Sequence, residues 1–179
     1  QRIDLIMYTF RADRTGWRFV GAFAAAARRG CRVRVAYDAI GCRGEGQEHF
    51  RRLREAGVEA YLINPLLPRQ SSHLWYPAFR DHRKILAVDD RIGFVGGLNI
   101  GDEYSGYAQD ELHWRDNAIQ IVGPAARYLR RLVDASYMDC WAHSPAAEEE
   151  ELASGGVPLW VHSPEPFDFR RIMQKTFLA

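Results

Sequence analysis

The chain has 179 residues, of which 47% are hydrophobic and 26% are charged, values that are ordinary for a soluble globular protein of one domain. Its formal net charge of +1 argues against a dedicated nucleic-acid-binding protein, because binding to a phosphate backbone usually requires a basic surface. No apolar run approaches the roughly 18 residues of a membrane span, and the three cysteines are not spaced as a disulfide framework or as a metal site.

The first third of the chain alternates between strand and helix patterns. Residues 31–37 alternate between apolar side chains and arginines, as in a strand with one buried face. Gly30 and Gly57 end two predicted helices, since glycine favours the position after a helix. The predicted strands cover residues 3–10, 31–37 and 58–63, and the predicted helices cover residues 15–29 and 45–56. This order predicts an α/β fold in which a mixed, largely parallel sheet is flanked by helices.

A long loop over residues 64–81 follows the third strand. Loops of this length in a compact domain are often functional. Its large apolar side chains either pack under the loop or contact a hydrophobic substrate such as a lipid; they are Leu74, Trp75, Tyr76 and Phe79.

The rest of the chain continues with further elements. We predict a hairpin over residues 81–99, a polar loop over 100–113, a strand over 115–122, a helix over 124–141 and a short strand over 157–162. We expect residues 1–145 to form one domain. Residues 146–179, which open near a run of four acidic residues, are expected to be a linker and the start of a following segment of a longer protein.

The hairpin contains an unusual set of chemical groups. Its sequence, DHRKILAVDDRIGFVGGLN, covers residues 81–99. His82 and Lys84 are two residues apart, which on a strand places both side chains on one face, about 7 Å apart. A neutral imidazole can attack a phosphate, and a lysine can neutralise the oxygens of that phosphate. Gly96 and Gly97 let backbone come close to a ligand, and Asn99 offers an amide donor, so the set predicts a phosphate cradle.

Asp89 has a different place in this pattern. It lies seven residues after His82, and this odd spacing would direct its side chain to the opposite face of an uninterrupted strand. We therefore expect Asp89 to be a structural residue that holds backbone N–H groups at the hairpin turn.

Taken whole, the stretch His82-x-Lys84-x4-Asp89-x6-Gly96-Gly97-x-Asn99 resembles the HKD motif of the phospholipase D superfamily. Three later stretches sharpen the resemblance. They are GGLNIGDEY over residues 96–104, WRD over 114–116 and VGPAA over 122–126, and they look like the first HKD half of bacterial cardiolipin synthases.

The resemblance implies a displacement in two steps. His82 would attack a phosphodiester and form a phosphohistidine, while Lys84 and Asn99 hold the phosphoryl oxygens. In the superfamily an acidic residue after the motif contacts the far nitrogen of the histidine, and Asp116 is our match to it. Weaker candidates for this role are Asp110 and Glu111. The chemistry needs neither a metal nor a cofactor.

One departure from the superfamily pattern matters. Its members use two HKD motifs, whose histidines divide attack and proton transfer between them. This chain has one motif, and His113, in the sequence His-Trp-Arg, lacks the partner lysine and the later spacing. The resemblance therefore implies half an active site. The other half would follow Ala179 in the same parent chain or come from a homodimer mate.

The expected function is phosphatidyl transfer of the cardiolipin synthase type, with phosphatidylglycerol as the substrate. Alternatives are a phospholipase D hydrolase, a phosphodiesterase or nuclease of the same superfamily, and a lipid-binding module without activity. Nucleic acid is not an expected partner, because the chain is nearly neutral. The resemblance further implies a peripheral place at the cytoplasmic face of a bacterial cell membrane, with no transmembrane segment in this chain.

Overall fold

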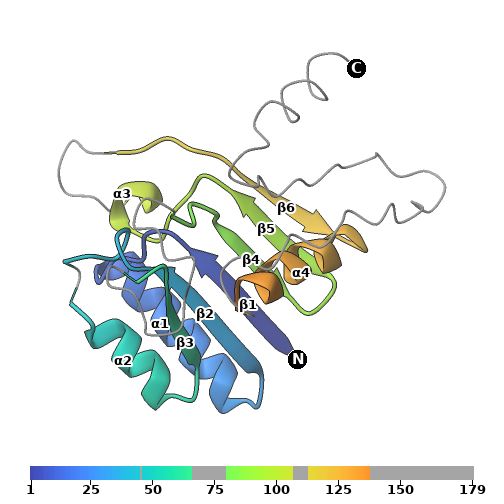
Figure 1. Cartoon of the computed structure of the whole chain (residues 1–179), viewed down its shortest axis with the longest axis horizontal. Coiled ribbons are helices and arrows are strands. Elements are labelled where there is room, and N and C mark those ends of the chain that lie inside the picture. Colours follow the sequence, from blue (N-terminus) through green and yellow to red (C-terminus); the bar gives the residue numbers. More distant parts are fainter. Residues whose placement is uncertain (45, 66–79, 107–112, 138–179) are drawn as a thin grey trace.

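The apolar runs of the sequence pair into a single sheet in a computed structural model, which describes residues 1–44, 46–65, 80–106 and 113–137. The strands in these ranges are β1 (Arg2–Met7), β2 (Arg32–Asp38), β3 (Glu59–Ile63), β4 (Ile85–Val88), β5 (Ile92–Gly96) and β6 (Ala118–Val122). The helices are α1 (Arg14–Arg28), α2 (Glu48–Glu55), α3 (Asp102–Ser105) and α4 (Ala125–Tyr137) (Figure 1).

The sheet has the strand order β3-β2-β1-β4-β5-β6. β1 pairs with β2 and β2 pairs with β3 in parallel, because α1 and α2 carry the chain back between these strands. The other three strand pairings within the described residues, β1 with β4, β4 with β5 and β5 with β6, are antiparallel. A short turn joins β4 to β5. β1, β2, β3 and β5 thus run in one direction. The mixed sheet flanked by helices confirms the predicted fold class.

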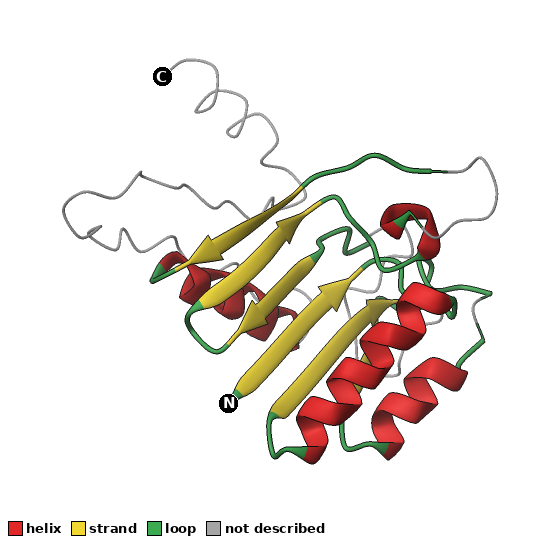
Figure 2. Ribbon diagram, turned by 180° about the vertical axis from the view of Figure 1, so that it is seen from behind, coloured by secondary structure: helices red, strands yellow, loops and turns green. Residues whose placement is uncertain are grey.

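Helices cover both faces of the sheet, and the alternation of side chains along the strands explains why. Val33, Val35 and Tyr37 of β2 belong to a core under α1 and α2, together with Phe23 and Phe50 of those helices. Figure 2 shows α1 and α2 in front of one face and α4 behind the other. The core under α4 contains Ile6, Ala36, Ile85, Ile121, Leu129, Leu132 and Val133.

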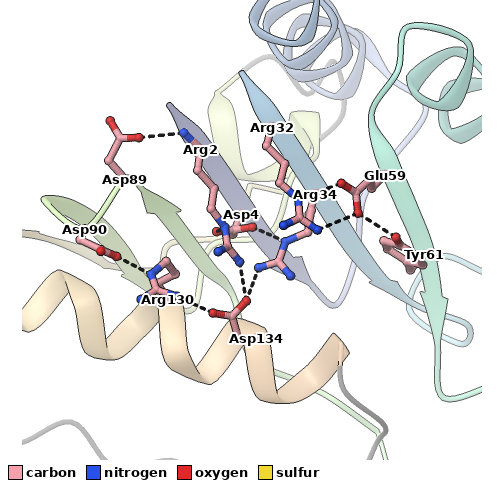
Figure 3. Close-up of polar contacts among 10 residues, drawn as sticks. All are labelled: Arg2, Asp4, Arg32, Arg34, Glu59, Tyr61, Asp89, Asp90, Arg130 and Asp134. Carbon is pink, nitrogen blue, oxygen red and sulfur yellow. Dashed lines mark hydrogen bonds and ion pairs between the residues drawn. The ribbon is translucent and has the colours of Figure 1, made fainter. Parts of the chain in front are cut away.

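An ionic network fastens α4 to the sheet (Figure 3). Asp134 of α4 accepts hydrogen bonds from the guanidinium groups of Arg2 and Arg34, and Arg130 Nη1 donates to its Oδ2 at 2.6 Å. Arg34 Nε also donates to Oδ1 of Asp4 at 2.5 Å, and only 1% of Asp4 is exposed. Burial raises the pKa of Asp4 to about 6, although the neighbouring Arg2 opposes this shift. The arginines of β2 on this face therefore line the sheet in ion pairs.

The polar stretch over residues 100–113 was expected to be a loop, and this prediction is wrong at α3. Tertiary contacts hold this short helix against the start of α1. Asp102 Oδ1 accepts hydrogen bonds from Thr15 N at 2.8 Å and from Thr15 Oγ1 at 2.6 Å. Asp13 Oδ2 in turn accepts the N–H of Asp102 at 2.6 Å. Contacts between segments almost 90 residues apart leave no local pattern that predicts a helix.

Some predictions fall outside the described residues. These are the loop side chains Leu74, Trp75, Tyr76 and Phe79, the acids Asp110 and Glu111, the end of the helix over 138–141, the acidic run over 148–151 and the strand over 157–162. Within the described ranges, no helix is long and apolar enough to cross a membrane.

Candidate active site

One edge of the sheet collects the polar residues that the sequence singled out. β1, β2, β3 and β5 end at this edge and β4 and β6 begin there, because the pairing brings Met7 opposite Tyr37, Ile85 opposite Ile6 and Gly96 opposite Ala118. In sheets of this kind, ligands bind beyond the carboxyl ends of the parallel strands. The residues that flank the strand ends here are Tyr8, Asp38, Asn64, His82, Lys84, Gly97, Asn99 and Asp116.

His82 and Lys84 lie in direct contact immediately before β4, which begins at Ile85. Lys84 Nζ lies 3.0 Å from His82 Nδ1 and donates a hydrogen bond to the carbonyl oxygen of His82 at 2.7 Å. The strand geometry predicted from the sequence placed the two side chains about 7 Å apart. They come closer because they stand on irregular backbone outside the strand. Lys84 is 5% exposed, whereas His82 is exposed and can be reached by a substrate.

The electrostatic surroundings keep the imidazole of His82 neutral. Although His82 is exposed, the part of its ring that is withdrawn from water and the adjacent Lys84 ammonium lower its pKa, and the carboxylates of Asp38 and Asp81 oppose this shift. Burial also lowers the pKa of Lys84, while Asp116 and Asp81 act in the opposite direction. A histidine with a lowered pKa is unprotonated near pH 7 and keeps a lone pair for attack.

Tyr8 joins this pair, although the sequence had not indicated it. Its ring centroid lies 4.4 Å from that of His82, with 52° between the ring planes. Lys84 Nζ lies 5.2 Å from the same tyrosine ring, within the range of a cation–π contact. The signal that could have found Tyr8 is its place directly after β1, at the edge where the other candidates gather.

Gly96 and Gly97 leave room for the chain that enters β6. A Cβ on Gly97 would lie 2.0 to 2.3 Å from the carboxyl atoms of Asp116, and a Cβ on Gly96 would lie 2.2 Å from Asn117 O. The N–H of Gly97 donates to Asn117 O at 3.0 Å. We had expected these glycines to let backbone approach a ligand. The structure gives a second reason for them, which is the close approach of residues 116–118.

The carboxylate of Asp116 favours the charged form of Lys84 and lies against Gly97. The resemblance to the phospholipase D superfamily implied that its carboxylate would lie at the far nitrogen of His82. In the structure Lys84 Nζ faces His82 Nδ1, and Asp116 Oδ1 accepts the N–H of Asn117 at 2.7 Å. Among the described residues, the carboxylates that act on the pKa of His82 are Asp38 and Asp81.

Asn99 ties two neighbouring segments to the site. Its Oδ1 accepts the N–H of Thr9 at 3.2 Å, and its Nδ2 donates to the hydroxyl of Tyr104 in α3 at 2.8 Å. An amide nitrogen carries two hydrogens, and within the described part of the chain one of those on Asn99 has an acceptor, so the other can serve a ligand.

Asp89 sits at the opposite end of β4 from His82, in the turn to β5. Its φ is +52°, its Oδ1 accepts the N–H of Arg2 at 2.7 Å, and its own N–H donates to Arg2 O at 2.8 Å. This geometry agrees with the expected structural role, with the addition that the backbone it holds belongs to β1. No cluster of three or more metal-ligating side chains occurs in the ranges that the structure describes.

Known proteins match this chain over most of its length. The family model described as "Cardiolipin synthase, PLD-like domain" matches residues 1–133. The cardiolipin synthase of Geobacillus kaustophilus is 37% identical over 177 residues, covering 91% of this chain and 34% of that protein. A cardiolipin synthase of Geobacillus sp. (strain WCH70) is 41% identical over 129 residues, covering 72% of this chain and 25% of that protein. The chain thus spans about a third or less of the length of these relatives.

Two solved structures share the fold. A polyphosphate kinase from Porphyromonas gingivalis matches with a TM-score of 0.55 and 16% identity, over 82% of this chain and 22% of that one. NucT from Helicobacter pylori matches with a TM-score of 0.51 and 15% identity, over 76% of this chain and 77% of that one. Identities this low speak for the fold alone. The family match covers well over half of the sequence, and the chain therefore belongs to the cardiolipin synthase PLD-like domain family of the phospholipase D superfamily.

Proposed function

We propose that this chain supplies a catalytic half of a cardiolipin synthase and that His82 transfers a phosphatidyl group through a phosphohistidine. The observation that carries the proposal is the exposed His82 ring, 3.0 Å from the ammonium of a buried lysine, in a chain of this family. The relatives are named cardiolipin synthases, which supports phosphatidylglycerol as the substrate.

In the first step the lone pair of the His82 imidazole forms a bond to phosphorus, and the bond from phosphorus to the glycerol oxygen breaks. The glycerol alkoxide leaves with a proton from a general acid. In the second step the hydroxyl of another phosphatidylglycerol gives its proton to the group that protonated the glycerol, and its oxygen attacks the phosphohistidine. This attack forms cardiolipin and frees His82. Glycerol is the second product.

Lys84 prepares the ring and then moves to the substrate. With the ammonium donating to Nδ1 of a neutral imidazole, the ring hydrogen lies on Nε2 and the attacking lone pair is the one on Nδ1, so the ammonium must leave Nδ1 before attack. A phosphodiester carries a full negative charge and attracts the ammonium more strongly than an imidazole lone pair does. We infer that substrate binding draws Lys84 to the phosphoryl oxygens, where its charge stabilises the transition state.

The neighbouring groups complete the proposed cradle. The second amide hydrogen of Asn99 is available to a phosphoryl oxygen, since the first goes to Tyr104. The carboxylate of Asp116 fills the space over Gly97 and favours the charged form of Lys84, against the larger effect of burial. Asp89 contributes to the site by holding the hairpin in place.

The other half of the site is part of the proposal. The superfamily pattern requires a second histidine as the general acid, either in the same parent protein or in a homodimer mate. The relatives are about three times as long as the matched stretch, which supports the first arrangement. We further propose that the protein acts as a peripheral enzyme at the cytoplasmic face of a bacterial membrane.

A nuclease activity finds less support in the charges of the structure. Arg32 Nε donates to Glu59 at 2.9 Å, and Arg34 is paired with Asp4 and Asp134. Arginines held in such pairs do not form the basic surface on which a nucleic-acid backbone binds. Hydrolysis of phospholipid uses the same first step and differs only in the acceptor, so an assay of the products distinguishes it.

The test uses the full-length protein with labelled phosphatidylglycerol in detergent micelles. We expect cardiolipin and glycerol as products, no turnover in His82→Ala, and full turnover in His113→Ala, a control at another exposed histidine. Phosphatidic acid as the sole product would indicate the hydrolase, and nicked plasmid with unchanged lipid would indicate a nuclease. Normal turnover in His82→Ala would refute the role of the nucleophile.

A further inference from the structure

Asp38, the last residue of β2, has no part in the reaction described above. Its side chain is 0% exposed, so its carboxylate is withdrawn from water. Removing a carboxylate from water is costly unless hydrogen bonds or opposite charges compensate. The contacts of Asp38 therefore indicate what holds this charge inside the protein.

Both oxygens of the Asp38 carboxylate accept hydrogen bonds. Oδ1 accepts the backbone N–H groups of Ile40 at 2.8 Å and Gly41 at 3.2 Å, in the turn after β2. Oδ2 accepts the side-chain amide of Asn64 at 3.0 Å and the backbone N–H of Asp81 at 3.4 Å. The carboxylate thus joins the end of β2 to the end of β3 and to the residue directly before His82.

Arg80 adds a positive charge to the same junction. Its Nη1 lies 3.9 Å from Asp38 Oδ1 and donates a hydrogen bond to the carbonyl oxygen of Asn64. Two consecutive residues, Arg80 and Asp81, are therefore fastened to the ends of β2 and β3. The next residue along the chain is His82, which stands on irregular backbone without the support of a strand.

We propose that Asp38 is a positioning residue for the nucleophile: it anchors the segment that carries His82 and Lys84 and acts on the imidazole as a buried negative charge. This inference rests on the proposed function, because only there is His82 identified as the nucleophile. The geometry of the junction stands independently of it.

The charge of Asp38 has a direct chemical use. When a neutral imidazole attacks phosphorus, positive charge develops on the ring, and a fixed negative charge nearby stabilises that charge. Asp38 and Asp81 favour the charged form of His82, against the effects of burial and of Lys84. Asp81 is itself bound by the guanidinium of Arg83, whose Nε donates to it at 2.8 Å. Among the described residues, the positively charged groups that contact the ring or its two carboxylates include Lys84, Arg80 and Arg83.

The test replaces Asp38 by asparagine, which keeps the size and one acceptor oxygen but removes the charge. The titration of the His82 ring is followed by NMR in the full-length protein without substrate, with His82→Gln to assign the signal. We expect the midpoint to move to lower pH, because a group that favours the imidazolium is lost. We also expect kcat/KM for phosphatidylglycerol to fall about 10- to 100-fold.

The matched control is Asp89→Asn, the same substitution at the other end of the hairpin. It removes a charge that braces β1, so it should lower stability while leaving the His82 midpoint in place. An unchanged midpoint in Asp38→Asn, or an equal shift in Asp89→Asn, would overturn the proposal. The midpoint requires no turnover, so a failure of the proposed activity would be seen separately, in His82→Ala.

A second variant covers the case in which Asp38→Asn does not fold. Arg80→Gln removes the guanidinium that lies 3.9 Å from Asp38, so the negative charge of the Asp38 carboxylate is no longer partly compensated by it. The His82 midpoint should then move to higher pH. A folded Arg80→Gln protein with the wild-type midpoint would equally overturn the role of Asp38.

Discussion

Alanine at Gly97 tests how the two glycines shape the site. The new Cβ would lie 2.0, 2.2 and 2.3 Å from Oδ2, Oδ1 and Cγ of Asp116, whereas an ordinary contact begins at 3.4 Å. One of the two groups must therefore move by about 1.4 Å. Overpacking in a core typically costs about 1–3 kcal/mol, and since Asp116 is exposed and its carboxylate can rotate, we expect the lower end of that range. The backbone of Gly97 has no positive φ, so alanine is otherwise compatible with it.

A double-mutant cycle isolates this contact. Asp116→Ala removes the three atoms that would clash, so Gly97→Ala should cost about 1 kcal/mol alone and less than about 0.5 kcal/mol beside Asp116→Ala. Denaturant unfolding of the four proteins measures both values. Gly21→Ala in α1 serves as the control, because its Cβ would meet nothing within 4 Å, and it should stabilise by about 0.4–1 kcal/mol.

The cycle can also refute the reasoning. An equal cost of Gly97→Ala in both backgrounds would mean that Asp116 is not the reason for the glycine. Kinetics of the same proteins separate the two uses of Gly97. If the glycine also lets phosphate approach, the double variant should show a higher KM than Asp116→Ala alone. Equal KM values would mean that the glycine serves only to make room for Asp116.

Three further outcomes are expected. Asp89→Ala should lose about 1–2 kcal/mol of unfolding free energy in denaturant titrations, because the hydrogen bond to Arg2 N at 2.7 Å is removed. Burial raises the pKa of Asp4 from 3.8 to about 6, so the stability that its protonated carboxyl contributes is full below pH 4 and is lost as the pH rises through 6. In urea unfolding, the free energy of unfolding of the wild type relative to Asp4→Asn should therefore fall by up to about 3 kcal/mol between pH 4 and pH 7. Tyr8→Leu should lower kcat by about tenfold, because the ring beside His82 is lost, while Tyr8→Phe should retain most of the activity in the lipid assay.

The sequence predicted the parts of the fold that depend on local patterns. Alternation over residues 31–37 predicted β2 and the face of the sheet on which each side chain lies. Val33 and Arg34 do lie on opposite faces. Asp89 was also expected to be structural and does form hydrogen bonds to β1, but the odd-spacing argument behind that expectation does not apply, because His82 stands before β4 and Asp89 in the turn after it. The inference about β2 uses the period of a strand, which a single sequence displays directly.

The contacts that complete the site could not be predicted in this way. Asp38 reaches the segment before His82 across 43 positions of sequence, and Gly97 meets Asp116 only because β5 pairs with β6 in one register. Such contacts depend on how strands are ordered in the sheet. A general rule would still have drawn attention to Asp38 and Tyr8, because both stand at the carboxyl ends of parallel strands, where α/β sheets bind ligands.

The charges at this edge suit one part of the proposed reaction better than the other. Attack by His82 places positive charge on the ring near Asp38 and Asp81, and it brings a phosphate anion to Lys84, so both developing charges meet an opposite one. The departing glycerol oxygen needs a proton as well. Lys84 is a poor source of it, because a deprotonated amine would no longer neutralise the phosphate, and Asp116 acts to keep that lysine charged. The charges thus support our proposal that this half carries out nucleophilic attack and that a second histidine delivers the proton.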